Sequence, residues 1–153
     1  MPRPPIAFDK SFLDTDFEIA LEIARELKAE GGHALLVGGC VRDAILKLSP
    51  KDLDMEVRGL QPDHLRNILA KHHGLDEIGK SFGVLKLKGV EIEVSLPRTE
   101  AKLELGHKGF SVEVDPHLPF PEAASRRDFT VNAIGLDPLT GELLDPLGGA
   151  KDL

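Results

Sequence analysis

The feature that most constrains the fold is an apolar run that ends at a pair of glycines. Residues 34–37 are apolar, and Gly38 and Gly39 follow. Residues 41–48 have the composition of a helix, which Pro50 would end. This order predicts a buried strand, a tight turn and a helix, with another strand over residues 52–57. Backbone N–H groups at a glycine turn before a helix can bind phosphate, although an ordinary tight turn has the same composition.

Two pairs of acidic residues have a spacing of two, which places both members of each pair on one face of a strand. Asp52 and Asp54 lie on the predicted strand after the helix, and Glu91 and Glu93 lie in a hairpin predicted over residues 83–96. If the two strands are neighbours, Glu93 completes a cluster of three carboxylates that can hold two metal ions. Carboxylate oxygens favour Mg²⁺ or Mn²⁺. A solvent-exposed strand face is the alternative, which we prefer for Glu91.

Further polar residues have the chemistry to bind a nucleotide. Arg42 falls on the first turn of the predicted helix, where its guanidinium can reach either a phosphate or Asp43. Residues 126–133 can present a guanidinium, a carboxylate and an amide toward a ribose or a phosphate, or else form a helix start that Asp128 caps. The candidate nucleotide-binding side chains are Arg42, Lys80, Arg98, Arg127, Asp128 and Asn132.

The remaining segments are predicted to support this site. Residues 1–13 contain several prolines and should be extended. The helix that follows has an apolar stripe formed by Ala20, Ile23, Ala24 and Leu27. We expect helices over residues 14–30, 62–74 and part of 123–134, a loop with one weak strand over 99–124, and a turn with a short hairpin over 137–146.

Composition limits the partners of the chain. It has 153 residues and a net charge of −7, with no Trp or Tyr, so it lacks the basic surface and the aromatic platform of a free-standing nucleic-acid binder. Any RNA must therefore be held by a local basic patch or by another domain. No apolar run reaches membrane-spanning length. The single Cys40 excludes an internal disulfide and fits a reducing compartment, so we expect a cytoplasmic protein without a membrane partner.

Taken together, these segments resemble the bacterial tRNA nucleotidyltransferase and poly(A) polymerase family, in the class II form that contains the CCA-adding enzymes. The resemblance extends over about residues 30–153. A Gly-Gly-x-Val-Arg-Asp signature corresponds to residues 36–43, and a metal-binding Asp pair corresponds to residues 52–54. A hairpin corresponds to residues 79–98, and an Arg-Arg-Asp-Phe-Thr-x-Asn-Ala block corresponds to residues 126–133. The end of a catalytic head corresponds to residues 145–153.

The resemblance implies an α+β fold, the polymerase-β-like nucleotidyltransferase head, in which a small mixed or antiparallel sheet is backed by helices. It divides the chain into an N-terminal arm and helix over residues 1–30 and a catalytic head over residues 31–153. The neck, body and tail domains of the family have no counterpart in this sequence. Those domains supply base choice and tRNA binding, so we expect the head alone to bind RNA weakly.

The resemblance also implies a reaction. Two Mg²⁺ ions, or Mn²⁺ as a substitute, support template-independent transfer of nucleotides from CTP or ATP to the 3′ end of RNA. CCA addition to tRNA is the expected form, with poly(A) addition and a nucleotide-binding accessory domain without turnover as alternatives. By position, the metal-binding catalytic residues are Asp52, Asp54 and Glu93, the triphosphate contacts are Gly38, Gly39 and Arg42, and the ribose-reading residues are Arg127, Asp128 and Asn132.

Overall fold

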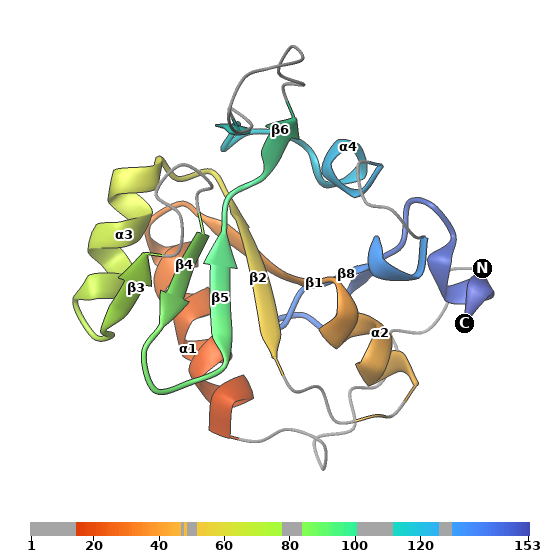
Figure 1. The fold of residues 1–153 in the computed structure, drawn as a ribbon, viewed down its shortest axis with the longest axis horizontal. Coiled ribbons are helices and arrows are strands. Elements are labelled where there is room, and N and C mark those ends of the chain that lie inside the picture. The colour runs from red at the N-terminus through yellow and green to blue at the C-terminus, as the bar shows by residue number, and fades with distance from the viewer. Residues whose placement is uncertain (1–14, 47, 49–51, 78–83, 101–111, 126–129) are drawn as a thin grey trace, which may run out of the picture.

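The computed structural model describes residues 15–46, 48, 52–77, 84–100, 112–125 and 130–153. Its main element is a seven-stranded sheet with the strand order β3-β4-β5-β2-β1-β8-β9 (Figure 1). Neighbouring strands are antiparallel except for β2 and β5, which are parallel. In the order of the sheet, the strands are Leu75–Glu77, Val84–Leu87, Ile92–Ser95, Leu53–Arg58, His33–Val37, Gly135–Leu136 and Leu143–Leu144.

Two helices, α1 (Thr15–Ala29) and α3 (Pro62–Ala70), cover one face of the sheet, which we call the back face (Figure 1). The predicted apolar stripe of α1 is buried there, with relative exposures of 2% or less. None of the helices within the described ranges is long and apolar enough to cross a membrane. The other helical segments are α2 (Gly39–Ile45), α4 (Phe120–Ala124), η3 (Thr130–Asn132) and η4 (Gly149–Asp152).

Alternation along β2 separates the two faces of the sheet. The odd-numbered residues from Leu53 to Val57 lie in the main core with α1 and α3 and are 6% exposed or less. Because successive side chains of a strand point to opposite faces, Asp54, Glu56 and Arg58 lie on the other face, which we call the front face. A smaller apolar cluster covers part of the front face, and it contains Leu35, Val37, Phe120, Ala124 and Ala133.

The structure differs from the sequence-based expectation in several places. β3 was not predicted, because three residues directly after Gly74 are too few to show alternation; pairing with β4 defines this strand. The segment predicted as a loop with one strand contains a separate two-stranded sheet, β6 (Arg98–Glu100) with β7 (Val112–Val114), and then α4. The helical part of 123–134 is divided between α4, which follows Pro119, and η3.

Candidate active site

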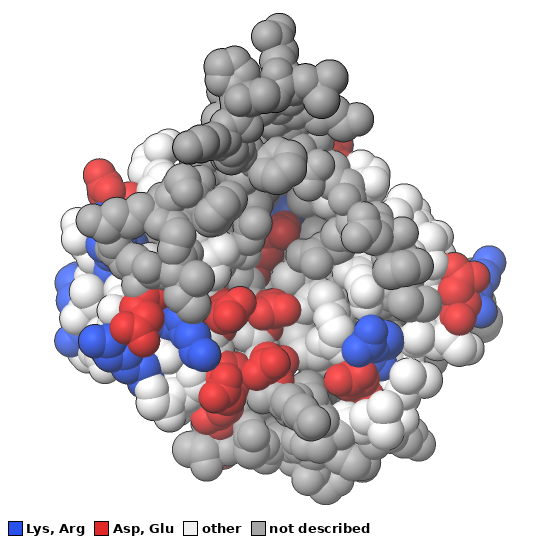
Figure 2. All heavy atoms as spheres, in the orientation of Figure 1, with Lys and Arg blue, Asp and Glu red and all other residues white. Residues whose placement is uncertain are grey.

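Two of the predicted carboxylates meet on the front face of the sheet. Asp54 on β2 and Glu93 on β5 are direct partners in the parallel register, and both are half-buried. Neighbouring strands lie about 4.8 Å apart, so the two side chains extend side by side. The same row continues through Val37 on β1 to Gly135 on β8. Figure 2 shows acidic side chains gathered over the part of the molecule where β2 and β5 lie.

The other two acidic candidates lie beyond the ends of these strands. Asp52 is exposed at a bend before β2, so it is not a strand residue as we had predicted. Glu91 precedes β5 and is exposed, and its carboxylate lies 3.8 Å from Nζ of Lys86. The backbone carbonyl of Glu91 accepts a hydrogen bond from the Leu53 N–H at 2.8 Å. This contact fixes where the two strands begin to pair.

The donor set fits a cation site that a substrate completes. Within the described residues, no group of three or more His, Cys, Asp and Glu side chains is arranged to hold a metal ion. Mg²⁺ requires less of a protein, since it is usually bound by one or two carboxylates together with water and substrate phosphates. Asp54 and Glu93 provide two adjacent carboxylates with hard oxygen donors, and Asp52 stands directly before β2.

A glycine turn connects β1 to α2 next to this row. Gly38 has a φ of +75° and a ψ of −146°, a conformation that is essentially restricted to glycine. A Cβ atom on Gly39 would lie 3.1 Å from Nη2 of Arg42, so the second glycine leaves room for that guanidinium. The thiol of Cys40 donates to the Val37 carbonyl at 3.1 Å. Cys40 is 6% exposed, and this burial raises the pKa of its thiol to about 11.

Two predicted nucleotide-binding residues from distant segments are in contact. Nη1 of Arg42 donates to Oδ1 of Asn132 at 3.1 Å, and Nε of Arg42 donates to Oδ1 of Asp43 at 3.2 Å. The side chain of Arg42 is still 36% exposed, so part of the guanidinium remains accessible to a ligand. Asn132 belongs to η3, which packs against η4 near the C-terminus.

Of the four remaining candidates, the structure describes Arg98. Lys80, Arg127 and Asp128 lie outside the described residues. The backbone of Arg98 belongs to β6 and pairs with Val114 on β7. The site as described therefore combines a carboxylate pair with an Arg–Asn contact, and the two are linked by the glycine turn.

One charged pair on the front face was missed by the sequence analysis. Glu56 is 6% exposed and forms an ion pair with Arg58, two residues further along β2. The signal was present in the sequence, because three charged residues starting at Asp54 recur at a spacing of two along an otherwise apolar strand.

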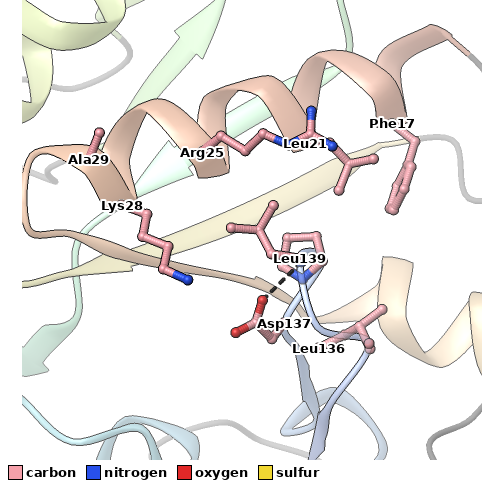
Figure 3. A pocket seen from close by; sticks show the side chains of 10 residues that line it. Phe17, Leu21, Arg25, Lys28, Ala29, Leu136, Asp137 and Leu139 are labelled. Atoms are coloured by element: carbon pink, nitrogen blue, oxygen red, sulfur yellow. Dashed lines mark hydrogen bonds between the residues drawn. The ribbon is translucent and has the colours of Figure 1, made fainter.

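A separate cavity lies on the back face, between α1 and the turn after β8 (Figure 3). It encloses about 720 Å³. Phe17, Leu21 and Leu139 give it apolar walls, and Arg25 and Lys28 add two cations from α1. The sheet separates this cavity from the carboxylate pair, so the cavity is not part of the candidate active site.

Asp137 lines this cavity and fixes the turn after β8. Its Oδ1 accepts a hydrogen bond from the Leu139 N–H at 2.9 Å, and its Oδ2 lies 2.9 Å from Nε2 of His33 on β1. Burial by itself raises the pKa of Asp137. The hydrogen bonds from His33 and from backbone N–H groups outweigh burial, so the pKa lies below its usual value.

The sequence matches one protein family and many curated proteins. The family model, described as the poly A polymerase head domain, matches residues 34–153. Multifunctional CCA proteins of Xylella fastidiosa (strain M23) and Xanthomonas euvesicatoria pv. vesicatoria are 41% and 42% identical to this chain over 118 residues. Each alignment covers 77% of this chain. It covers 27% of the first relative and 28% of the second, so this chain spans little more than a quarter of either.

Solved structures have the same fold. A CCA-adding enzyme of Bacillus stearothermophilus in complex with CTP has a TM-score of 0.71 and 32% identity, covering 91% of this chain and 32% of that one. A tRNA nucleotidyltransferase complexed with a primer tRNA and an incoming ATP analog has a TM-score of 0.63 and 32% identity, covering 85% of this chain and 36% of that one. The predicted polymerase-β-like fold is confirmed. The chain belongs to the poly A polymerase head domain family, within the tRNA nucleotidyltransferases and poly(A) polymerases.

Proposed function

We propose that this chain is the catalytic head of an enzyme that adds CCA to the 3′ end of tRNA, taking nucleotides from CTP and ATP without a template. The observation that carries the proposal is the register of Asp54 beside Glu93 on the front face of the sheet. Relatives named CCA-adding enzyme or multifunctional CCA protein, including one solved with CTP and a tRNA nucleotidyltransferase solved with tRNA and an ATP analog, support these substrates. Polyadenylation is the alternative that the family description favours.

Asp54 and Glu93, together with Asp52, would hold two Mg²⁺ ions in this proposal, with Mn²⁺ as a substitute. When bound, the ions activate the attacking 3′ hydroxyl and neutralise charge on the triphosphate. The contribution of the chain is to hold two carboxylates side by side on strands whose opposite face is packed. Adjacent carboxylates repel each other in the absence of a cation, which favours cation binding at this point.

Gly38, Gly39 and Arg42 bind the triphosphate in this proposal. Arginine has five N–H donors, and contacts with Asp43 and Asn132 engage two of those of Arg42. The other donors can bind phosphate oxygens, and bidentate contacts of this kind are among the stronger hydrogen bonds in proteins. The proposed ribose-reading residues are Arg127, Asp128 and Asn132, and the further phosphate contacts are Lys80 and Arg98.

Residues 31–153 form the catalytic head in this proposal, and they bind RNA weakly by themselves. The reason is charge, because the chain has a net charge of −7 and gathers acidic side chains on the front face (Figure 2). RNA affinity depends on neutralisation of phosphates by Lys and Arg. The cytoplasmic location inferred from the single Cys40 stays a prediction.

Primer extension tests the proposal. The chain is incubated with Mg²⁺, a tRNA that lacks CCA, and each NTP alone or all four together, and the products are resolved at single-nucleotide length. Ordered addition of C, C and A would place base choice in the head itself, whereas addition without order would leave base choice to the other domains of the family. Incorporation at the 3′ end is expected in either case. It should be lost in Asp54→Ala and retained in the matched variant Glu91→Gln. Long A tails would assign the head to polyadenylation, and NTP binding in calorimetry without incorporation would assign it to an accessory domain without turnover.

A further inference from the structure

Arg58 is a nearly buried arginine on the same strand face as Asp54. Its side chain is 13% exposed and pairs with the carboxylate of Glu56, whose side chain is 8% exposed. Nε of Arg58 donates to the carbonyl of Leu118 at 2.7 Å, and the guanidinium carbon lies 5.3 Å from the centre of the Phe120 ring. Arg58 therefore joins the strand that carries Asp54 to the segment where α4 begins.

Phe120 continues this connection across the front face. It is 7% exposed and packs in the small cluster that includes Val37. A Cβ atom on Gly135 would lie 2.7 Å from Cζ of Phe120, so the ring lies directly against the backbone of β8. Gly135 follows Asn132 by three residues, and Asn132 accepts the hydrogen bond from Arg42. The ring thus lies between Arg58 on β2 and the chain segment that orients Arg42.

Stability alone does not account for an arginine at position 58. Its Nη1 atom is buried and has no hydrogen-bond partner among the residues that the structure describes. A buried donor without a partner lowers stability. Apolar residues of similar volume can often replace a buried ion pair without loss of stability. A planar guanidinium, in contrast, holds a carboxylate, a carbonyl and an aromatic ring at fixed angles, which no other side chain does.

We propose that Arg58 is a positioning residue for the nucleotide site. It fixes Leu118 and Phe120 against β2, and through Gly135 it sets where the Asn132–Arg42 contact lies relative to the carboxylate pair. The inference rests on the proposed function, because the distance between Arg42 and the carboxylate pair matters only if one bound NTP contacts both.

Two variants separate positioning from stability. Arg58→Met removes the guanidinium from the carboxylate of Glu56, whereas the double variant Glu56→Gln/Arg58→Met removes both charges of the ion pair. Asp137→Asn is the control, because it weakens a polar contact at the cavity that α1 lines. Three quantities are measured on the full chain. They are the thermal unfolding midpoint, the hydrogen exchange of residues 118–124 and 130–136 by mass spectrometry, and the dissociation constants of CTP and ATP by calorimetry.

The double variant should be more stable than Arg58→Met, yet both segments should exchange faster than in the wild type. CTP and ATP should bind about tenfold more weakly, a change of about 1.4 kcal/mol, which is roughly the contribution of one hydrogen bond to a charged group. Asp137→Asn should be less stable than the wild type with unchanged exchange in 118–124 and unchanged affinities. Wild-type exchange and affinity in the double variant, or equal losses in Asp137→Asn, would overturn the inference. If the wild type binds no NTP, the proposed function fails, and the exchange data still decide whether Arg58 positions the two segments.

Discussion

The Glu56–Arg58 pair should show strong coupling in the free energy of unfolding. The two side chains are 8% and 13% exposed, so both charges are largely removed from water. Removing one partner of a buried ion pair costs about 3–5 kcal/mol, because the other charge stays buried after its counter-charge is lost. We expect this loss for Glu56→Gln and for Arg58→Met. The double variant should lose only about 1–2 kcal/mol, which includes the hydrogen bond to Leu118. The coupling energy is then about 4 kcal/mol, above the roughly 0.5–3 kcal/mol that is usual for residues in contact.

Urea unfolding followed by far-ultraviolet circular dichroism measures these free energies, since the chain has no Trp or Tyr for fluorescence. The exposed pair of Lys88 and Asp76, with Nζ and Oδ1 3.6 Å apart and side chains 61% and 57% exposed, is the control cycle. That pair should show less than about 1 kcal/mol of coupling. A coupling energy for Glu56 and Arg58 as small as the control would show that water still solvates their charges, and the argument from burial would be wrong.

Three further predictions concern single residues. Glu93→Gln should lower nucleotide incorporation about 100-fold or more, and Glu91→Gln by less than about twofold; equal losses in primer extension would reassign the ligand. Asp137→Asn should cost about 1 kcal/mol at pH 7. Because the pKa of folded Asp137 is lowered, this contribution is present above its unfolded pKa near 3.8 and is lost as the pH falls through the folded pKa, so the urea curves of the two proteins should converge in acid. Cys40, with a pKa of about 11, should react with a disulfide reagent at pH 8 about 100-fold more slowly than a thiol of pKa 9.0. In urea, which unfolds the chain, it should react at the full rate. Rapid labelling of the native chain would contradict its burial.

Local sequence pattern was sufficient for the elements that carry the site. The apolar run before Gly38 predicted β1, and the positive φ of Gly38 shows why a glycine is needed there. Alternation predicted the strands of Asp54 and Glu93, with the start of β2 displaced by one residue so that Asp52 falls outside it. These features depend on neighbours within a few residues, which is the range over which a sequence pattern carries information.

Contacts between distant segments could not be predicted in the same way. Arg58 meets Phe120 across 62 positions of sequence, and Phe120 in turn lies against Gly135. The contact between His33 and Asp137 spans 104 positions. Taken alone, none of these residues carries a sequence signal that identifies its partner. The strand order β5-β2-β1-β8 brings the partners together, and local sequence pattern does not reveal that order.

The back face of the sheet determines which carboxylates meet on the front face. Ile92 and Val94 on β5 are completely buried on the back face next to Met55 on β2. A slip of β5 by one residue would turn both apolar side chains to the front and Glu93 into the core. Exposing the two apolar side chains costs about 1.5–3 kcal/mol each, and burying a carboxylate without a partner costs several kcal/mol more. That sum is comparable to the whole stability of a typical domain, about 5–15 kcal/mol. The position of Glu93 beside Asp54 is therefore fixed by apolar side chains on the opposite face of the sheet, so substitutions in that core should disturb the carboxylate pair without altering any residue of the site.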